Sequence, residues 1–289
     1  SPYTGGHCAR VPEITMMLAD AVHNTDYGPF AKTKFSEKEL YELKIAAWLH
    51  DCGKVATPEF VVDKSTKLET IYDRINEVGT RFVVLHRDAE IEKLKKELKI
   101  ERNESLSFDQ KQQEIKKLNN EFKKTIEQLK VDESFVKESN IGGEFMSPDK
   151  KDRINEISRY QWQPNGEMKN FLSEDEVYNL SIARGTLTAE ERKVINDHIV
   201  VTIKMLEELP YPKHLKNVPE FAGGHHEKLD GTGYPKGLTK DEMSVQARIM
   251  AIADIFEALT ARDRPYKKGK TLSQAMRILG FMKDDAHID

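Results

Sequence analysis

Two adjacent histidines stand before a glycine-rich turn in the last third of the chain. After His225 and His226 the chain runs through four further residues into Gly231-Thr232-Gly233-Tyr234-Pro235. Neutral imidazole is the commonest transition-metal ligand in proteins, and glycine lets the backbone come close to a bound molecule. The stretch therefore predicts a metal site beside a turn that can meet a ligand.

Side chains that could complete a metal site occur elsewhere in the chain. His50 ends a stripe of small and apolar residues, and Asp51 follows it directly. A lone histidine on an apolar face is more often a satisfied core residue, which is the alternative interpretation of His50. Asp51 and Lys54 beside it favour the metal site. The inward-facing polar residues predicted in this way are His7, His50, Asp51, His198, His225, His226 and Asp254.

This set of ligands indicates a particular chemistry. Histidines and carboxylates without cysteine suit Fe, Mn, Ni, Co or Zn, and the set exceeds what one tetrahedral ion requires. Two divalent ions that share a carboxylate are therefore expected. Such a pair, typically about 3.5 to 4 Å apart, can generate a bridging hydroxide and clamp a phosphoryl oxygen. The predicted reaction is hydrolysis of a phosphoester.

Helices must position these residues. Ser36 and Glu39 form a predicted capping box, and the helix that they open carries His50 at its inward end, with Gly53 as its stop signal. A second capping box at Thr188 and Glu191 opens another helix. The inward face predicted for that helix consists of Val194, His198, Val201 and Met205.

Two further helices are expected near the carboxyl end. Thr239 and Glu242 are predicted to cap a strongly apolar helix in which Asp254 interrupts an apolar run, on a face of small residues. An unpaired carboxylate there would be costly, so Asp254 needs a cation or several donors. Thr271 and Gln274 cap a last helix. Because no alternating strand pattern occurs, the fold class predicted for the body is all-α.

A charged stretch interrupts this body. Residues 71–153 are rich in Lys, Glu, Gln and Asn, and their apolar residues thin to a heptad-like seam. We expect a long antiparallel helical hairpin inserted between 1–70 and 154–289. It is either a dimerisation or signal-relay arm or a solvated insertion with one thin buried face. The seam consists of Ile91, Leu94, Leu98, Ile115, Leu118, Phe122 and Leu129.

Composition excludes several classes of protein. The formal net charge of −4 over 289 residues argues against a general nucleic-acid binder, whose surface should be basic. Cys8 and Cys52 form neither a C-x-x-C metal motif nor a disulfide framework, which fits a reducing compartment. With no apolar run of membrane-spanning length and no signal-peptide pattern, a cytoplasmic segment without membrane contact is expected.

Three of these motifs resemble a known family. His50-Asp51-Cys52-Gly53-Lys54 is similar to the HD-x-G-K signature of the HD superfamily of metal-dependent phosphohydrolases. His225 to Pro235 resembles the H-H-E-x-x-D-G-x-G-Y-P box of its HD-GYP subgroup, and Arg264-Pro265-Tyr266-Lys267 resembles the R-P-Y-K segment of that subgroup. The resemblance implies an HD-type helical bundle and a bacterial cyclic dinucleotide phosphodiesterase that cleaves cyclic di-GMP to linear pGpG, GMP or both.

The same resemblance implies a role for individual residues. Asp51 would bridge the two metals and, with Lys54, carry the catalysis. Tyr234, Arg264 and Lys267 would contact the substrate together with Lys54, although a turn-filling tyrosine and a surface cationic turn are the alternatives. The metal ligands would divide into His7, His50, Asp51 and Asp254 for one ion and His198, His225, His226 and Asp51 for the other.

Departures from the family pattern leave other expectations open. Members with three metals have a glutamate where this chain has Tyr3, so two ions are expected, with Fe or Mn ahead of Ni, Co and Zn. Both ends look trimmed, as in a module excised from a longer chain with an N-terminal sensory part.

Alternative functions are a phosphodiesterase for hybrid cyclic GMP-AMP, a non-catalytic cyclic-dinucleotide sensor or adaptor, and a di-iron oxygenase.

Overall fold

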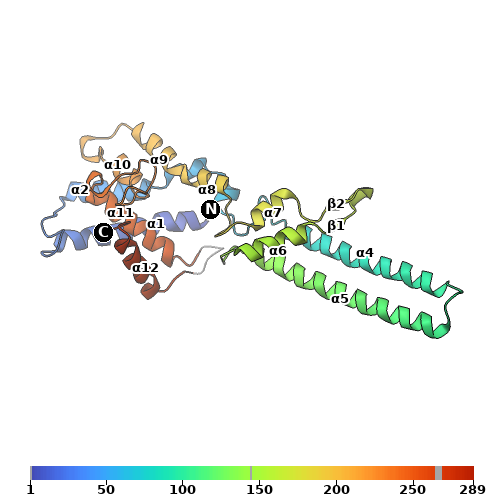
Figure 1. The fold of residues 1–289 in the computed structure, drawn as a ribbon. Helices are drawn as coiled ribbons and strands as arrows, with labels where there is room; N and C mark the ends of the chain where they lie inside the picture. The colour runs from blue at the N-terminus through green and yellow to red at the C-terminus, as the bar shows by residue number, and fades with distance from the viewer. Residues whose placement is uncertain (1, 144, 264–268) are drawn as a thin grey trace. The chain divides into compact units, whose positions relative to one another are not determined.

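The computed structural model describes residues 2–143, 145–263 and 269–289 (Figure 1). Helices dominate these residues, and the only sheet among them is an antiparallel pair of two-residue strands. The prediction of an all-α fold is therefore confirmed. The described residues divide into two compact units, of which one comprises the chain up to Asp63 together with Ala189–Asp289, and the other Lys64–Thr188.

The first unit is a bundle of helices. In it α1 packs against α2 and α11, while α10 packs against α2, α9 and α11. Their shared core includes Leu43, Ala46, Leu206, Phe221 and Met250, all nearly inaccessible to solvent. The helices of this unit are α1 (Pro2–Asn24), α2 (Glu37–Leu49), α3 (Glu59–Val62), α8 (Ala189–Asn196), α9 (His198–Glu207), α10 (Val218–Gly223), α11 (Val245–Thr260) and α12 (Leu272–Asp284), with the 3₁₀ turns η1 (Cys52–Ala56), η3 (Lys213–Leu215) and η4 (Lys240–Glu242).

Side-chain caps fix where several of these helices begin. The predicted capping boxes of Ser36 with Glu39 and of Thr271 with Gln274 are both present, at the starts of α2 and α12. The predicted cap of the apolar helix is wrong. Thr239 and Glu242 close the 3₁₀ turn η4, and α11 begins after Ser244, whose hydroxyl accepts a hydrogen bond from the Ala247 amide at 3.1 Å.

Two predictions about helix faces and ends also need correction. The helix expected after Thr188 is broken, because α8 ends at Asn196 and α9 starts at His198. Val194 and Met205 are each 41% exposed, so they do not share the buried face of His198. That face consists of Ile199, Thr202, Ile203 and Leu206. The helix before the HD motif ends at Leu49, ahead of the stop expected at Gly53.

The second unit is built on two long helices. Figure 1 shows α4 (Ile75–Glu101) and α5 (Phe108–Asn140) side by side and antiparallel. Arg81 on α4 pairs with the buried carboxylate of Glu176 through two contacts of 2.7 and 2.8 Å. The remaining elements of the unit are α6 (Pro148–Ser158), β1 (Gln161–Trp162), the turn η2 (Pro164–Gly166), β2 (Lys169–Asn170) and α7 (Glu174–Leu180).

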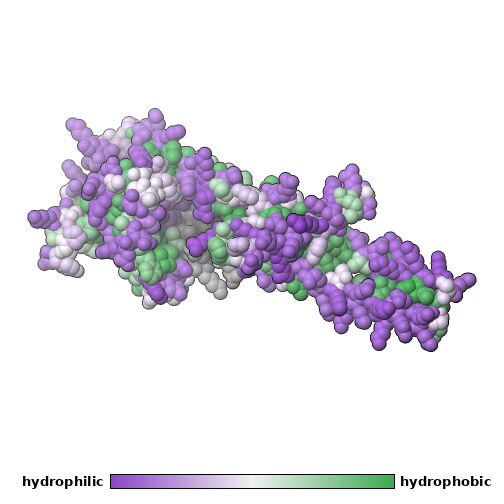
Figure 2. Space-filling view, viewed as in Figure 1, coloured by the Kyte–Doolittle hydropathy of each residue, from purple (hydrophilic) through white to green (hydrophobic). Residues whose placement is uncertain are grey.

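Apolar residues are sparse along this pair of helices. Figure 2 shows a mainly hydrophilic surface over α4 and α5, with apolar residues gathered where the two helices meet. Leu118 and Leu129 are buried, while Ile91, Leu94 and Leu98 are about half exposed. None of the helices formed by the described residues combines the length and apolar character that a membrane span needs. The predicted division into 1–70 with 154–289 and an insertion at 71–153 stays a prediction.

Candidate metal centre

Helix ends bring the predicted ligands together inside the first unit. His50 caps the carboxyl end of α2, Asp51 precedes η1 and His198 opens α9. The buried His225 and its neighbour His226 follow the end of α10. His7 on α1 and Asp254 on α11 reach the same place from two helices that pack together.

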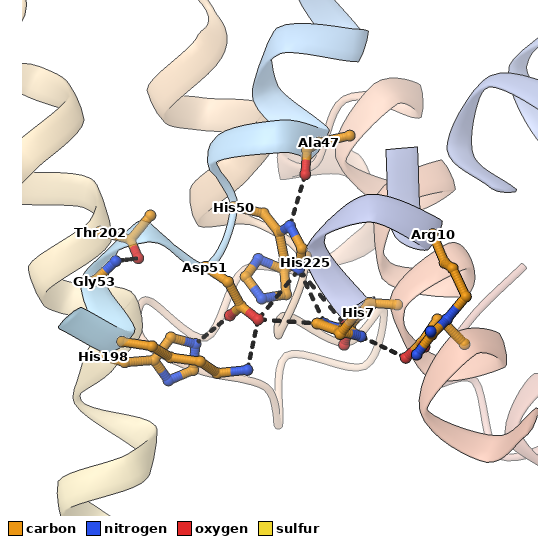
Figure 3. Close-up of polar contacts among 12 residues, drawn as sticks. His7, Arg10, Ala47, His50, Asp51, Gly53, His198, Thr202 and His225 are labelled. Carbon is orange, nitrogen blue, oxygen red and sulfur yellow. Dashed lines mark hydrogen bonds and ion pairs between the residues drawn. The ribbon is translucent and has the colours of Figure 1, made fainter. Parts of the chain in front are cut away.

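Asp51 lies at the middle of this arrangement (Figure 3). Its Oδ2 atom is 3.3 Å from Nε2 of His7, 3.4 Å from Nε2 of His50 and 2.5 Å from Nζ of Lys54. Its Oδ1 atom faces the other way and lies 3.1 Å from Nε2 of His198. The two oxygens of one buried carboxylate therefore face different histidines.

Ligand atoms gather in three overlapping groups within 4.8 Å of one another. The groups are His7 with His50 and Asp254, His198 with His225 and His226, and His50 with Asp51 and His225. The third group contains Asp51 and shares His50 with the first and His225 with the second. The geometry thus offers two places for a cation, joined through Asp51.

The chemistry of the donor atoms fits metal ions. Nε2 of His225 is buried with no hydrogen-bond partner, and Nε2 of His198 and Oδ1 of Asp51, although 3.1 Å apart, are not aligned for a hydrogen bond and have no other partner. Buried polar atoms are rarely left without a partner, because the loss of hydration is costly. Nδ1 of His225 contacts the carbonyl oxygen of Ala222 at 2.6 Å, which directs its Nε2 inward as in metal-binding histidines. Divalent cations would satisfy these atoms.

The surroundings raise the pKa of one histidine of the centre and lower the pKa of two others. Burial by itself would lower the pKa of His7, but hydrogen bonds with Asp254, Asp51 and Glu257 raise that pKa to about 11. Burial lowers the pKa of His225 well below its usual range and that of His226 to about 4, although Asp254 opposes the shift at His226. His225 and His226 are therefore neutral at neutral pH, which is the form that binds metal.

The carboxylates of the centre stay ionised. Burial would raise the pKa of Asp51, but His50 and Lys54 outweigh it and hold that pKa well below its usual range. Asp254 behaves in the same way, because hydrogen bonds with His50 and His7 overcome its burial and keep its pKa low. Both residues therefore offer negatively charged oxygens for a cation.

A close backbone approach holds the HD motif against α9. The Gly53 amide donates a hydrogen bond to the hydroxyl of Thr202 at 2.9 Å. A Cβ atom on Gly53 would lie 2.1 Å from the carbonyl oxygen of His198 and 2.5 Å from the Thr202 amide nitrogen. Only glycine fits there, so Gly53 brings Asp51 and His198 within reach of each other.

The glycine-rich turn folds back on the double histidine. The Tyr234 ring stacks on the His226 ring, with centroids 4.8 Å apart and planes 23° apart. Glu227 is buried and accepts hydrogen bonds from the amides of Lys236 and Leu238 at 2.7 and 2.9 Å. Glu227 thus holds the turn closed through the backbone. Asp230 caps the amide and hydroxyl of Thr232 as a turn residue.

Lys54 is the predicted substrate-facing cation that the structure describes. Burial alone would lower the pKa of Lys54, but Asp51 raises it, so the ammonium group stays charged. The predicted contacts Arg264 and Lys267 lie outside the described residues, as does the side chain of Tyr3. The structure therefore tests neither the substrate contacts predicted for Arg264 and Lys267 nor the expectation that rests on Tyr3.

Two residues around His7 were missed from the sequence. Glu257 is 1% exposed and its Oε2 atom contacts Nδ1 of His7. Arg10 donates to Oε1 of the same carboxylate from Nε at 2.8 Å and from Nη2 at 2.6 Å. The available signal was spacing, because Glu257 lies three residues after Asp254 on one helix and Arg10 three residues after His7 on another.

The described side chains that could hold metal lie in a helical unit, and a comparison with known families agrees with a metal site there. Residues 174–289 match the family model described as HD domain. This match to an HD domain agrees with the resemblance to the HD superfamily found in the motifs. The match includes His198, His225, His226 and Asp254, whereas the HD motif itself comes earlier in the chain and is joined to them by the fold. An HD domain implies binding of divalent metal.

Two curated relatives each match about a third of the chain. The 3'3'-cGAMP-specific phosphodiesterase 3 of Vibrio cholerae is 41% identical over 95 residues, which are 33% of this chain and 20% of that protein. The cyclic di-GMP phosphodiesterase of Thermotoga maritima is 40% identical over 93 residues, which are 32% of this chain and 25% of that protein. The chain thus spans a quarter or less of the length of these relatives.

Proposed function

We propose that this chain is a metal-dependent phosphodiesterase of the HD-GYP type that hydrolyses a cyclic dinucleotide. The observation that carries the proposal is the position of Asp51, whose two oxygens face His7 and His50 on one side and His198 on the other. A carboxylate in that position suits two ions held side by side. The names of the curated relatives support the substrate class.

The proposed centre holds two divalent ions, with Fe or Mn expected before Ni, Co or Zn. When bound, such a pair acidifies water and withdraws charge from a phosphoryl oxygen. The first ion would be held by His7, His50, Asp51 and Asp254. The second would be held by Asp51, His198, His225 and His226. The buried Nε2 atoms of His198 and His225, neither of which forms a hydrogen bond, support this assignment.

The chain's own side chains would handle the phosphate and the bases. Lys54 carries its charge beside Asp51, so it can pair with a phosphate oxygen or give a proton to the leaving oxygen. The aromatic face of Tyr234, stacked on His226, can meet a nucleobase at the edge of the centre. Arg264 and Lys267 are proposed as further phosphate contacts from their place in the sequence alone.

Two cyclic dinucleotides are candidate substrates. One of the relatives above is named for 3'3'-cGAMP and the other for cyclic di-GMP. Cyclic di-GMP, cleaved to linear pGpG, GMP or both, is the first candidate, and hybrid cyclic GMP-AMP is the second. The sequence shows no base-reading code that would choose between them, so an assay must compare the two.

A homodimer through α4 and α5 is proposed as the form of assembly. Ile91, Leu94 and Leu98 are 47%, 48% and 55% exposed on α4, although their spacing is that of a buried seam. A second copy could cover them as in a coiled coil. Light scattering should then give twice the chain mass, and Leu94→Glu should give the monomer. A wild-type monomer would contradict this assembly.

A cytoplasmic location is also proposed. It rests on the two free cysteines, Cys8 and Cys52, which fit a reducing compartment. Attachment to an N-terminal sensory part stays a prediction.

The proposed activity can be tested with purified protein stripped of metal by a chelator. Chromatography should find no cleavage of cyclic di-GMP or 3'3'-cGAMP in the stripped protein, and cleavage of at least one after addition of Mn²⁺ or Fe²⁺. Cleavage that chelation does not affect would contradict the mechanism. If the fully metal-loaded protein binds a cyclic dinucleotide and leaves it intact, the protein is instead a non-catalytic sensor.

A further inference from the structure

His7 differs from three other predicted ligands in what contacts its second ring nitrogen. Nδ1 of His50 and Nδ1 of His225 each lie near a backbone carbonyl oxygen three residues earlier, at 2.7 and 2.6 Å. Nδ1 of His198 contacts the Ile195 carbonyl in the same way. Nδ1 of His7 instead contacts the carboxylate of Glu257, which comes from another helix. A charged side chain therefore takes the place of the local backbone at this histidine.

Both oxygens of Glu257 are used. Oε2 accepts from His7, and Oε1 accepts from Nε and Nη2 of Arg10 at 2.8 and 2.6 Å. The far side of the Arg10 guanidinium pairs with Asp263 at 2.9 Å. Because both guanidinium donors converge on Oε1, Arg10 holds that oxygen and leaves Oε2 directed at His7. Figure 3 shows His7 between Asp51 and the side chain of Arg10.

The spacing on the two helices explains how one imidazole is held at both nitrogens. Asp254 and Glu257 are three residues apart on α11, so they project from one face. Oδ1 of Asp254 lies 3.0 Å from Nε2 of His7, and Glu257 contacts Nδ1. A carboxylate on Nδ1 keeps the proton on that nitrogen and leaves Nε2 to face Asp51 and Asp254.

We propose that Glu257, oriented by Arg10, is a positioning residue that holds His7 as an Nε2 ligand and strengthens the metal site on the His7 side. The proposal rests on the metal centre of the proposed function. Carboxylates that accept a hydrogen bond from a ligating histidine fix its tautomer and raise its basicity, and their loss typically weakens metal affinity about 10- to 100-fold. Glu257 should act on one of the two ions.

Titration with Mn²⁺ tests this without measuring phosphodiesterase activity. In Glu257→Gln the amide offers one acceptor oxygen where the carboxylate uses two, so calorimetry should show one Mn²⁺ site weakened about 10- to 100-fold and the other unchanged. Glu42→Gln is the matched control, since Glu42 is equally buried and accepts from the Asn217 amide at 2.6 Å, away from the ligands. Both sites should keep their affinity in this control.

Unchanged affinity at both sites in Glu257→Gln, or an equal loss at both, would overturn the proposal. If that variant does not fold, Glu257→Asp keeps the charge for Arg10 but shortens the reach to His7, and the same pattern is expected. NMR of the wild-type protein loaded with Zn²⁺ gives an independent result, because Nδ1 of His7 should carry a proton. A His7 with no proton on Nδ1 would also overturn the proposal. Mn²⁺ affinity and the proton on Nδ1 can be measured even if the protein cleaves no cyclic dinucleotide. The role of Glu257 and the proposed activity can therefore be contradicted separately.

Discussion

Oδ1 of Asp51 lies 3.1 Å from Nε2 of His198, although the whole unit Lys64–Thr188 separates the two residues in the sequence. The other oxygen of Asp51 lies 3.3 Å from Nε2 of His7. One side chain thereby reaches both groups of potential ligands. Asp51 is the residue on which the proposed two-metal centre depends most.

Asp51→Asn should remove both metal and activity. The amide loses the negative charge that two cations would share, so kcat/KM should fall at least about 100-fold and metal content should fall with it. Elemental analysis and a cleavage assay measure the two effects. Asp197→Asn, an exposed carboxylate beside His198, is the control that should retain both. Wild-type turnover in Asp51→Asn would contradict the bridging role.

Lys54→Ala should separate catalysis from metal binding. The ammonium group contacts Asp51 at 2.5 Å but is not a metal ligand, so the ions should remain bound. Loss of a positioned acid or phosphate contact should lower kcat about 100-fold. Lys54→Arg keeps the charge and should recover part of the rate. A variant that loses its metal together with its activity would show that Lys54 acts on the ligands.

Tyr234→Ala and His225→Ala should have different phenotypes. Removing the ring that stacks on His226 should raise KM about tenfold while the metal stays bound, because stacking on a base contributes about 1 to 3 kcal/mol. His225→Ala should cost metal and turnover together. Tyr234→Phe keeps the ring and serves as the control. If Tyr234→Ala loses metal as His225→Ala does, the turn is a structural brace.

Gly53→Ala should destabilise the first unit. The new methyl group would lie 2.1 Å from a backbone oxygen of His198, so η1 or α9 must shift at a cost of about 1 to 3 kcal/mol or more. Gly280→Ala is the matched control, because it lies inside α12 with nothing within 4 Å of the added atom. It should stabilise the helix by up to about 1 kcal/mol. Urea unfolding measures both, and equal stability of the two variants would contradict the close approach.

Alkaline pH should weaken the second unit through Tyr160. Burial and a hydrogen bond to Asp132 at 2.6 Å raise the pKa of Tyr160 to about 12, against 10.0 for an ordinary phenol. The folded state therefore keeps a proton that the unfolded state loses, and this stability is complete below pH 10 and is lost as pH rises toward about 12.

The Tyr160→Phe variant checks this dependence on pH. The difference in free energy of unfolding between wild type and Tyr160→Phe should shrink across that window, as followed by urea unfolding at several pH values. Tyr27→Phe, which removes the hydroxyl group of an exposed tyrosine, is the control and should show no such trend. A difference that stays constant with pH would contradict the shifted pKa.

Local patterns predicted the helices better than their boundaries. Ser36 and Thr271 act through residues three positions away, so their capping boxes could be recognised in the sequence. Thr239 carries an equally good box, but the chain leaves the helical conformation at Met243 and Ser244 caps α11 instead. The break between α8 and α9 has no Gly or Pro to mark it.

The site shows the same division between local and tertiary information. The seven side chains predicted as ligands could be singled out because each is an unusual polar residue in an apolar pattern or motif. The contact between Glu257 and His7 joins residues at opposite ends of the chain, so only the packing of α1 against α11 shows it. The distinct contacts of the two Asp51 oxygens likewise depend on Gly53 and α9 meeting closely.

Anomalous diffraction from crystals loaded with Mn²⁺ tests the central claim most directly. The account predicts two manganese peaks about 3.5 to 4 Å apart, with one Asp51 oxygen on each. His7, His50 and Asp254 should surround one peak, and His198, His225 and His226 the other. A single peak, or two peaks of which only one contacts Asp51, would contradict the account.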